Sequence, residues 1–451
     1  MSLSPTVATR SACESLLAEL ERRRLAGECD LKPLGDTLAA VPPTAADDPG
    51  NPPPRRRGRP AKGATPAESP PLSPGLASLP VYLGEFWTAR QRQVHSIHEV
   101  SYRACFKPQL PAFFLDHASA PGEPVYDPFM GRGTTLVEAA LRGRLPAGND
   151  ANPLSVQLVQ PRLQPPPLTA IQQRLTEVNL PLRPPADDAE RELLVFFHPD
   201  TLAELLGWRD YFAARRAAAT FDAVDGWIEM VACNRLTGHS RGFFSVYTLP
   251  PNQATSVKAQ RRINERRDQQ PDYRDTRQLI GRKTLKLFRD PLPAGYGRDA
   301  PLLLSRSADH TPELDDGSIA LVVTSPPFLN VVQYDKDNWM RSWFAGRDIG
   351  EVPFWQSSSL PLWVDRMRAA FTELHRVVQP GGVIAFEVGE VGRGKIELEH
   401  QVLQAAVAAG LVPLAIMINQ QNFTKTANCW GVANNQRGTN SNRIVVLERK
   451  G

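Results

Sequence analysis

Runs of apolar residues, several of them β-branched, recur along most of the chain and predict buried strands. Ile319–Val323 is the clearest run, and its composition is typical of a strand buried on both faces, as in an open parallel sheet. Amphipathic patterns predict helices over Leu362–Val378 and Ile396–Ala409. Further strands are predicted near residues 125, 145 and 302, and over Val383–Val388, Leu411–Ile418 and Arg443–Arg449.

A different pattern occupies residues 164–295, where prolines are followed by helical periodicity. After Pro165–Pro167 and Pro181–Pro185, helices are predicted at Ala189–Phe197, Leu202–Ala219 and Phe221–Cys233. The loop Thr237–Gln253 that follows carries several aromatic residues, and its His239, Ser240 and Arg241 are candidates for base contacts. The segment is expected to be a helical insertion.

The first 80 residues are expected to be a mostly disordered tail. Ser11–Glu14 has the form of a capping box, and the leucines after it predict a short amphipathic helix. From Val41 to Pro80 the chain is rich in proline, alanine, serine and glycine. Such a composition buries too little apolar surface to offset the entropy of ordering.

Composition narrows the class of protein. The 451 residues are 41% hydrophobic and 22% charged, which indicates a globular chain with one large domain and additions. The net charge of +4 is small, so a nucleic-acid surface must arise from local clustering. Five dispersed cysteines without a CxxC pair argue against a zinc site or a disulfide framework and fit a reducing cytoplasm. No signal peptide or long apolar span is seen, so a soluble, intracellular protein is expected.

The segment Thr324–Phe328 ends the central predicted strand with two prolines. Pro326 and Pro327 cannot donate to a sheet ladder, so an extended turn follows the strand, at the edge where open parallel sheets bind ligands. The carbonyls of Ser325 and Pro326, the Ser325 hydroxyl and the flat face of Phe328 suit a planar heterocycle with an exocyclic amino group. On its own, the turn could equally be an ordinary strand-ending loop.

Asp127–Thr135 reads as a strand, a glycine-rich turn and the start of a helix. Its glycines allow backbone N–H groups and a helix N-terminus to approach a ligand closely. Asp150 follows the next predicted strand, where an acidic residue can accept both ribose hydroxyls of a nucleoside. The pyrophosphate-binding G-x-G-x-x-G fingerprint is absent, which favours an adenosine cofactor without a pyrophosphate over NAD.

Together, Asp127–Thr135, Asp150–Pro153 and Thr324–Phe328 resemble the motifs of the S-adenosylmethionine-dependent amino-methyltransferases of DNA. The resemblance implies an α/β fold with the seven-stranded, Rossmann-like sheet of class I methyltransferases, and S-adenosyl-L-methionine as cofactor. It implies a catalytic turn formed by Ser325, Pro326, Pro327 and Phe328. The cofactor would be held by Asp127, Phe129, Gly131, Gly133 and Thr134, with Asp150 on the ribose.

The resemblance covers about Val81–Leu163 and Pro301–Lys450 and implies two further contacts. Tyr102 and Lys107 lie in a segment corresponding to the family motif that closes over the cofactor, and Asp309 lies where the family binds the adenine ring. Residues 81–163 and 296–451 would then be the two halves of the methyltransferase domain. Residues 164–295 would be the target-recognition insertion between them.

Two basic segments are candidates for DNA contact. Arg57-Gly58-Arg59-Pro60 resembles an AT-hook, which lies in the narrow minor groove of A·T-rich DNA. A solvated basic linker is the alternative interpretation. In the insertion, four cations share one helical face at i, i+3, i+4 and i+8, which predicts a phosphate-binding face. The alternative is a solvated helix with internal ion pairs. These four are Lys258, Arg261, Arg262 and Arg266.

The predicted function is methylation of the cytosine N4 amino group in double-stranded DNA, after base flipping and by direct in-line transfer. The serine of Ser325-Pro-Pro is typical of the cytosine-N4 branch, and no Pro-Cys dipeptide of ring-carbon methylation occurs. Alternatives are an adenine-N6 enzyme, an RNA amino-methyltransferase, and an inactive AT-hook DNA-binding protein. No metal or membrane partner is expected. A restriction nuclease is a candidate partner, and the expected location is the bacterial or phage-type cytoplasm, with nucleoid association on DNA.

Overall fold

The structure is a computed structural model that describes most of the chain. The described residues are 11–39, 74–87, 94–103, 105–251, 254–327, 334–347, 352, 354–355, 359–388, 398–419 and 442–451. The predicted AT-hook residues Arg57 and Arg59, and Phe328 of the predicted catalytic turn, lie outside these ranges. No helix within the described ranges is both long enough and apolar enough to cross a bilayer.

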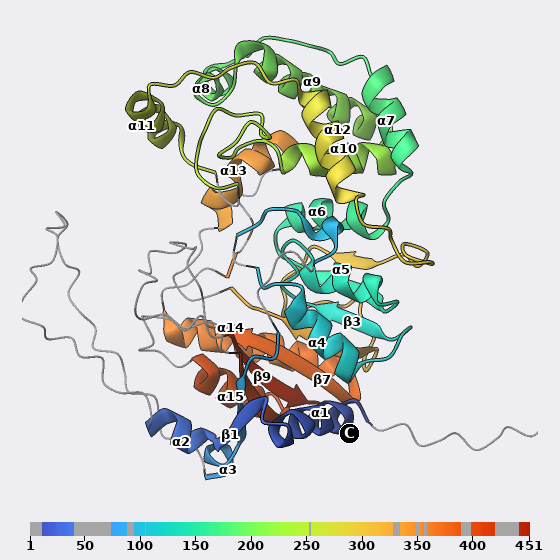
Figure 1. Cartoon of the computed structure of the whole chain (residues 1–451), viewed down its shortest axis with the longest axis vertical. Coiled ribbons are helices and arrows are strands. Elements are labelled where there is room, and N and C mark those ends of the chain that lie inside the picture. Colours follow the sequence, from blue (N-terminus) through green and yellow to red (C-terminus); the bar gives the residue numbers. More distant parts are fainter. Residues whose placement is uncertain are drawn as a thin grey trace, which may run out of the picture.

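One mixed sheet runs through the lower half of the molecule (Figure 1). Its strand order is β1-β2-β8-β9-β7-β6-β3-β4-β5. The strands β5, β4, β3, β6 and β7 run parallel to one another, whereas β9 is antiparallel to both β7 and β8. The strand bounds are β1 Cys29–Pro33, β2 Pro80–Gly84, β3 Pro124–Asp127, β4 Leu145–Asn149, β5 Leu302–Leu304, β6 Ile319–Thr324, β7 Val378–Val388, β8 Val412–Asn419 and β9 Asn442–Glu448.

The sheet has nine strands, so the expected number of seven was wrong. The two additional strands come from the N-terminal segment: β2 lies parallel to β8, with Val81 opposite Ile416, and β1 lies antiparallel to β2. The helix predicted after Ser11 is confirmed as α1 (Ala12–Leu25), with the capping box between Ser11 and Glu14. Residues 11–39 are thus the ordered part of the N-terminal segment, whereas most of Val41–Pro80, the stretch predicted to be disordered, lies outside the described residues. The apolar positions of residues 11–39, Leu16 and Leu20 among them, are buried against the sheet and its helices.

Helices cover both faces of the sheet, which explains the unbroken apolar run in β6. All six residues of β6 are buried. Leu321 and Val323 pack on the side of α1 and α4 (Gln109–Ala118), and Val322 packs on the side of α14 (Leu360–Val377) and α15 (Leu398–Ala408). Because successive strand residues point to opposite faces, burial on both faces requires apolar residues at every position.

The predicted helical insertion is present between β4 and β5, in the upper half of Figure 1. It follows α5 (Thr134–Leu141) and α6 (Pro153–Leu163), which flank β4. Its helices are α7 Leu168–Glu177, α8 Asp188–Glu192, α9 Pro199–Ala217, α10 Ala223–Cys233, α11 Val257–Arg267 and α12 Thr276–Leu287, with a short 3-10 turn at Leu193–Val195 (η3). Another 3-10 turn, η2 (Ser96–His98), precedes α4. The remaining short helices of the described chain are α2 Leu34–Ala39 and α3 Pro74–Ala77.

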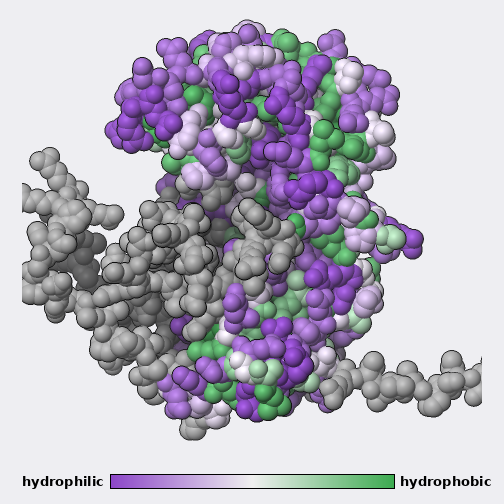
Figure 2. All heavy atoms as spheres, in the orientation of Figure 1, coloured by the Kyte–Doolittle hydropathy of each residue, from purple (hydrophilic) through white to green (hydrophobic). Residues whose placement is uncertain are grey.

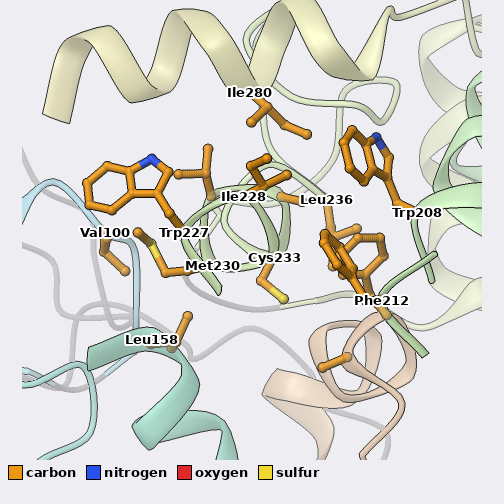
Figure 3. Packing of buried hydrophobic residues seen from close by; sticks show 14 of the residues in the cluster. Val100, Leu158, Trp208, Phe212, Trp227, Ile228, Met230, Cys233, Leu236 and Ile280 are labelled. Carbon is orange, nitrogen blue, oxygen red and sulfur yellow. The ribbon is translucent and has the colours of Figure 1, made fainter. Parts of the chain in front are cut away.

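The core of the insertion continues into the first half of the sheet domain. Figure 3 shows Leu158 of α6 pointing toward Met230 and Cys233 of α10. Two fully buried tryptophans complete this core, and both donate their indole N–H to a threonine of α12: Trp208 to Thr276 (3.1 Å) and Trp227 to Thr284 (3.0 Å). Buried donors thereby keep a partner in an otherwise apolar cluster.

Candidate active site

The carboxyl ends of β3 and β6 meet at the point where the strand order reverses. β3 pairs with β4 on one side and with β6 on the other, and Tyr126 lies opposite Val322. Chain connections leave such a point in opposite directions, which opens a crevice for ligands. Asp127 ends β3 and Thr324 ends β6, so the glycine turn and the Ser-Pro-Pro turn begin at the same edge of the sheet.

A direct hydrogen bond joins these two strand ends. Thr324 Oγ1 donates to Asp127 Oδ1 at 2.6 Å, and both side chains are buried. The same carboxylate oxygen accepts the Phe129 N–H at 3.1 Å. Burial raises the pKa of Asp127 to about 7, although these hydrogen bonds act in the opposite direction. Asp127, predicted to hold the cofactor, therefore holds the turn itself together.

The glycine turn adopts a conformation that requires glycine twice. Gly131 has φ 48° and Gly133, the residue preceding α5, has φ 71°, both in the left-handed region. A Cβ at Gly133 would lie 2.6 Å from Val159 Cγ2, and one at Gly131 would lie 3.4 Å from the Tyr102 ring. The turn is thus packed between Tyr102 and α6. The N-terminus of α5, including the predicted residue Thr134, follows it directly.

Asp150 follows β4 and reaches across to the glycine turn. Its two carboxylate oxygens accept backbone N–H groups, Oδ2 from Gly131 at 2.8 Å and Oδ1 from Asn152 at 2.8 Å. Burial raises the pKa of this carboxyl above its ordinary value. A carboxylate has about four lone-pair sites, so Asp150 retains acceptor capacity for a further ligand.

Two aromatic residues border the same region. The Tyr102 hydroxyl accepts a hydrogen bond from Asn152 Nδ2 at 3.4 Å, and burial raises the pKa of Tyr102. The half-buried Phe129 packs edge-on against Trp355, with ring centres 5.8 Å apart. Trp355 was not predicted, and neither its position nor its neighbours in the sequence indicated it.

The other two predicted cofactor contacts lie at the margin of this region. Lys107 precedes α4 and is half-buried, and burial lowers its pKa. Asp309 is exposed in the turn after β5. The end of β5 does adjoin Asp150, because Ser305 Oγ donates to the Asp150 carbonyl at 3.3 Å. Asp309 would need to point back toward Asp150 to touch a shared ligand.

The Ser-Pro-Pro turn leaves β6 with only part of its polar groups engaged. Ser325 and Pro327 are half-buried and Pro326 is buried. The Pro327 carbonyl accepts the indole N–H of Trp363 of α14 at 2.9 Å. Within the described part of the chain no donor reaches the Ser325 or Pro326 carbonyl, the two acceptors that sequence analysis singled out.

The buried Glu387 lies beside Ser325 and was not predicted from the sequence. Thr324 lies opposite Phe386 in β7, so Ser325 adjoins Glu387. The Ser325 hydroxyl and Asn442 Nδ2 both hydrogen-bond to the Glu387 carboxyl. Burial nevertheless raises the pKa of Glu387 above its ordinary value. Its signal in the sequence is an acidic residue near the end of the otherwise apolar run Val383–Val388.

The helix after the Ser-Pro-Pro turn, α13 (Tyr334–Ala345), connects the site to the insertion. Arg341 donates to the carbonyl of Ser101 at 3.0 Å and to that of Pro251 at 2.7 Å. Asp337 accepts both the Arg103 guanidinium at 2.7 Å and, through its carbonyl, the Ala254 N–H at 3.0 Å. Movement of the insertion loop would therefore be transmitted to α13.

The four predicted DNA-contacting cations lie together on α11. Lys258, Arg261, Arg262 and Arg266 are exposed, while Gln260 and Ile263 form the buried side of the helix. Figure 2 shows hydrophilic residues gathered over α11 at the upper left of the molecule. Arg261 makes one exposed ion pair, to Glu192 at 3.3 Å. The loop residue Arg241 is also exposed and pairs with Asp272 at 3.3 Å.

Sequence comparison finds a protein-family match over the first half of this site. Residues 73–160 match the protein family described as DNA methylase. The matched range contains β2, β3, the glycine turn, Asp150 and most of α6, but not the Ser-Pro-Pro turn.

Among individual proteins, the chain is similar to the Type II methyltransferase M.MjaII of Methanocaldococcus jannaschii. The two are 39% identical over 75 residues, which is 17% of this chain and 14% of that protein. The similarity therefore spans far less than two thirds of the relative.

Among solved structures, the chain matches a TehB-like SAM-dependent methyltransferase from Corynebacterium glutamicum at 10% identity. That match covers 77% of this chain and 90% of the other, with a TM-score of 0.28. A geranyl diphosphate methyltransferase in complex with SAM matches at 11% identity over 76% and 85% of the two chains, with a TM-score of 0.30. Scores this low establish no common architecture for the whole chain.

Proposed function

We propose that the protein is an S-adenosyl-L-methionine-dependent DNA methyltransferase that modifies the exocyclic N4 amino group of cytosine. The observation that carries the proposal is the 2.6 Å hydrogen bond between Thr324 and Asp127. It keeps a predicted cofactor turn and a predicted catalytic turn adjacent at one edge of the sheet. The family match over residues 73–160 supports DNA methylation as the reaction.

The residues at the glycine turn fit the proposed cofactor. Asp150 retains acceptor capacity after binding the Gly131 and Asn152 amides, which suits the hydroxyls of a ribose. The first-turn amides of α5, beside Thr134, have the partial positive charge that favours an amino-acid carboxylate. Phe129 and Trp355 provide apolar surface nearby. When bound, S-adenosyl-L-methionine supplies an electrophilic methyl group.

Ser325 and its neighbours would handle the amino group of the base. The amino nitrogen gains a bond to the methyl carbon as the carbon–sulfur bond breaks, so the nitrogen becomes positively charged and must lose a proton. The Ser325 hydroxyl and the Ser325 and Pro326 carbonyls can accept hydrogen bonds from this nitrogen. Glu387 can receive the proton through the Ser325 hydroxyl, because its raised pKa makes it a stronger base than an ordinary carboxylate.

The cations of α11 would supply the DNA contact. Lys258, Arg262 and Arg266 form no ion pair among the described residues, so their charge is available to phosphates. Arg57 and Arg59 would add minor-groove contacts as an AT-hook. Serine in the turn favours cytosine N4 over adenine N6, as in the branch whose motif it resembles.

The test is methyl transfer by the full chain from tritium-labelled S-adenosyl-L-methionine, offered double-stranded DNA and RNA separately. Digestion of the product to nucleosides and mass spectrometry then identify the base. We expect N4-methylcytosine from DNA, and loss of the product in Ser325→Ala. N6-methyladenine would overturn the choice of base, labelled RNA alone would overturn the choice of substrate, and unlabelled nucleic acid would overturn the enzymatic function. Single-molecule sequencing of DNA from expressing cells gives the sequence context.

A further inference from the structure

Tyr247 is an exposed aromatic residue in a loop whose other aromatic residues are buried. It lies between α10 and α11, and its side chain is 41% exposed, whereas Phe243 and Phe244 belong to the buried core. A single exposed aromatic residue is common on protein surfaces and indicates little by itself. The surroundings of Tyr247 are what distinguish it.

The backbone at Tyr247 is held by three amide side chains. The Tyr247 carbonyl accepts from Gln260 Nε2 at 3.0 Å and from Gln269 Nε2 at 2.9 Å. Both glutamines also donate to Asn264 Oδ1, at 2.7 and 2.8 Å, and Asn264 donates to the Val195 carbonyl at 2.8 Å. Gln260 is fully buried, so a polar residue is retained in the interior for this purpose.

The residues on either side of Tyr247 are fixed as well. The Val246 N–H donates to the Phe196 carbonyl at 2.9 Å, and the Thr248 N–H donates to the Gly238 carbonyl at 3.0 Å. The loop is therefore rigid where it presents an exposed ring. Pre-organisation of this kind lowers the entropic cost of binding a ligand.

Arg267, at the end of α11, stacks on the Tyr247 ring. Its guanidinium carbon lies 3.8 Å from the ring centre, and the residue is exposed. The planar guanidinium continues the stack and adds positive charge to it. Lys258, Arg262 and Arg266 lie on the same helix, so the pair stands within the most cationic part of the insertion.

We propose that the Tyr247–Arg267 pair is a stacking platform for one base of the DNA substrate. This base is the one that loses its pairing partner or its stacked neighbour when the target nucleotide leaves the duplex. Positive charge matches the phosphates around such a base, and planar aromatic and guanidinium groups match its face. The position suits this role, because four residues later Pro251 is bound to Arg341 of α13, the helix that follows the catalytic turn. This inference rests on the proposed function for its substrate.

The first measurement is independent of catalysis. A labelled duplex with one unpaired 2-aminopurine is titrated with the full chain, and fluorescence anisotropy and 2-aminopurine quenching are followed. Tyr247→Ala and Arg267→Ala should each weaken binding about 5- to 100-fold and reduce the quenching, whereas Tyr247→Trp should retain both. Binding to a fully paired duplex should change much less.

Tyr273→Ala is the matched control. Tyr273 is another exposed tyrosine of the insertion, at 50% exposure, but its hydroxyl is bound to Glu204 and no guanidinium of the described residues lies over its ring. The Tyr273→Ala variant should bind the duplex with the unpaired base as tightly as the wild type does. Equal effects of Tyr247→Ala and Tyr273→Ala, or no effect of either, would overturn the stacking role.

The second measurement is methyl transfer to a duplex that contains the context found by sequencing. Tyr247→Ala should slow methylation of the paired site and be largely rescued when the target cytosine is mismatched, since eversion is then easier. A wild type that methylates normally and a Tyr247→Ala variant that matches it on both duplexes would refute the inference and leave the proposed function intact. A wild type that binds through Tyr247 without methylating DNA would refute the proposed function alone.

Discussion

Thr324 donates its hydroxyl hydrogen to Asp127 across 197 residues of sequence, at 2.6 Å. This contact is the only side-chain bond within the described residues that joins the end of β6 directly to that of β3. Thr324→Val keeps the shape of the side chain but leaves a buried carboxylate without this donor, which costs about 1–3 kcal/mol. We expect a lower free energy of unfolding and a slower methyl transfer, measured by urea denaturation and by kcat.

Thr324→Ser is the control for that substitution, since it retains the hydroxyl and loses only a methyl group. It should recover most of both quantities. A Thr324→Val variant as stable and as active as Thr324→Ser would mean that the two turns are aligned without this hydrogen bond.

Asp127 should make stability depend on pH. Its pKa in the folded chain is about 7, above the ordinary value of 3.8, so the folded state binds more protons than the unfolded state between these values. The contribution of Asp127 to stability is therefore greatest in acid and falls as the pH rises from about 4 to about 7. Asp127→Asn removes this loss, because the amide oxygen can still accept from Thr324 and Phe129.

The measurement is the free energy of unfolding of Asp127→Asn minus that of the wild type, at several pH values. The difference should grow in favour of the variant as the pH rises toward 7. A difference that is constant with pH would show that Asp127 titrates at its ordinary value.

Glu387 should set the acid limb of the pH–rate profile. If it receives the proton through Ser325, it must be ionised, so kcat should decline as the pH falls through its raised pKa. Glu387→Gln preserves the size of the side chain and an acceptor oxygen but cannot take up a proton. We expect a lower kcat, an unchanged KM for S-adenosyl-L-methionine and loss of that limb. An unaltered profile in Glu387→Gln would assign the limb to another group.

Gly133→Ala should be far more damaging than Gly143→Ala, although the two glycines have nearly the same backbone conformation. Their φ angles are 71° and 70°. An added Cβ meets Val159 at 2.6 Å in the first case and nothing within 4 Å in the second. Gly143→Ala should cost on the order of 1 kcal/mol from backbone strain alone. Gly133→Ala should lower the free energy of unfolding by more than this and should also weaken cofactor binding, measured by calorimetry. Adding Val159→Ala to the Gly133→Ala variant should restore part of both losses.

Cofactor and DNA binding should be separable by mutation. Asp150→Ala removes the acceptors proposed for the ribose and should weaken S-adenosyl-L-methionine binding at least tenfold with little effect on DNA affinity. Arg262→Gln with Arg266→Gln should do the opposite and reduce the slope of log K against log salt by about 1.8, roughly 0.9 for each lost phosphate contact. Calorimetry and anisotropy at several salt concentrations measure the two. Parallel losses in both variants would contradict this division.

The sequence predicted the parts of the fold that local patterns specify. The buried strand at Ile319–Val323, the capped helix after Ser11 and the helices of the insertion are all present. These features depend on apolar periodicity and capping residues, which are readable within a short window. The strands β1 and β2 at one end of the sheet were missed because a strand such as Cys29–Pro33, with four exposed residues out of five, has no apolar pattern.

The same division holds for the site. Asp127, Gly131, Gly133 and Asp150 could be singled out because their turns follow recognisable strands. The partner of Asp127 could not, because Thr324 reaches it only through the order of strands in the sheet. Glu387 likewise reaches Ser325 only because β7 pairs with β6. Long-range register is a property of the whole fold, and one sequence does not contain it in any local window.

The shared core of α6 and α10 bears on how the proposed methyltransferase could acquire a new recognition sequence. Leu158 and Met230 belong to one apolar cluster, so the insertion and the first half of the sheet domain stabilise each other. Replacing residues 164–295 by a foreign insertion would remove the apolar residues that pack against Leu158 and its neighbours. The apolar surface of α6 would then be exposed or would border cavities. Diversification of specificity by exchange of whole modules is therefore costly here, and gradual substitution on exposed positions of α11 and its neighbouring loop is the accessible evolutionary route.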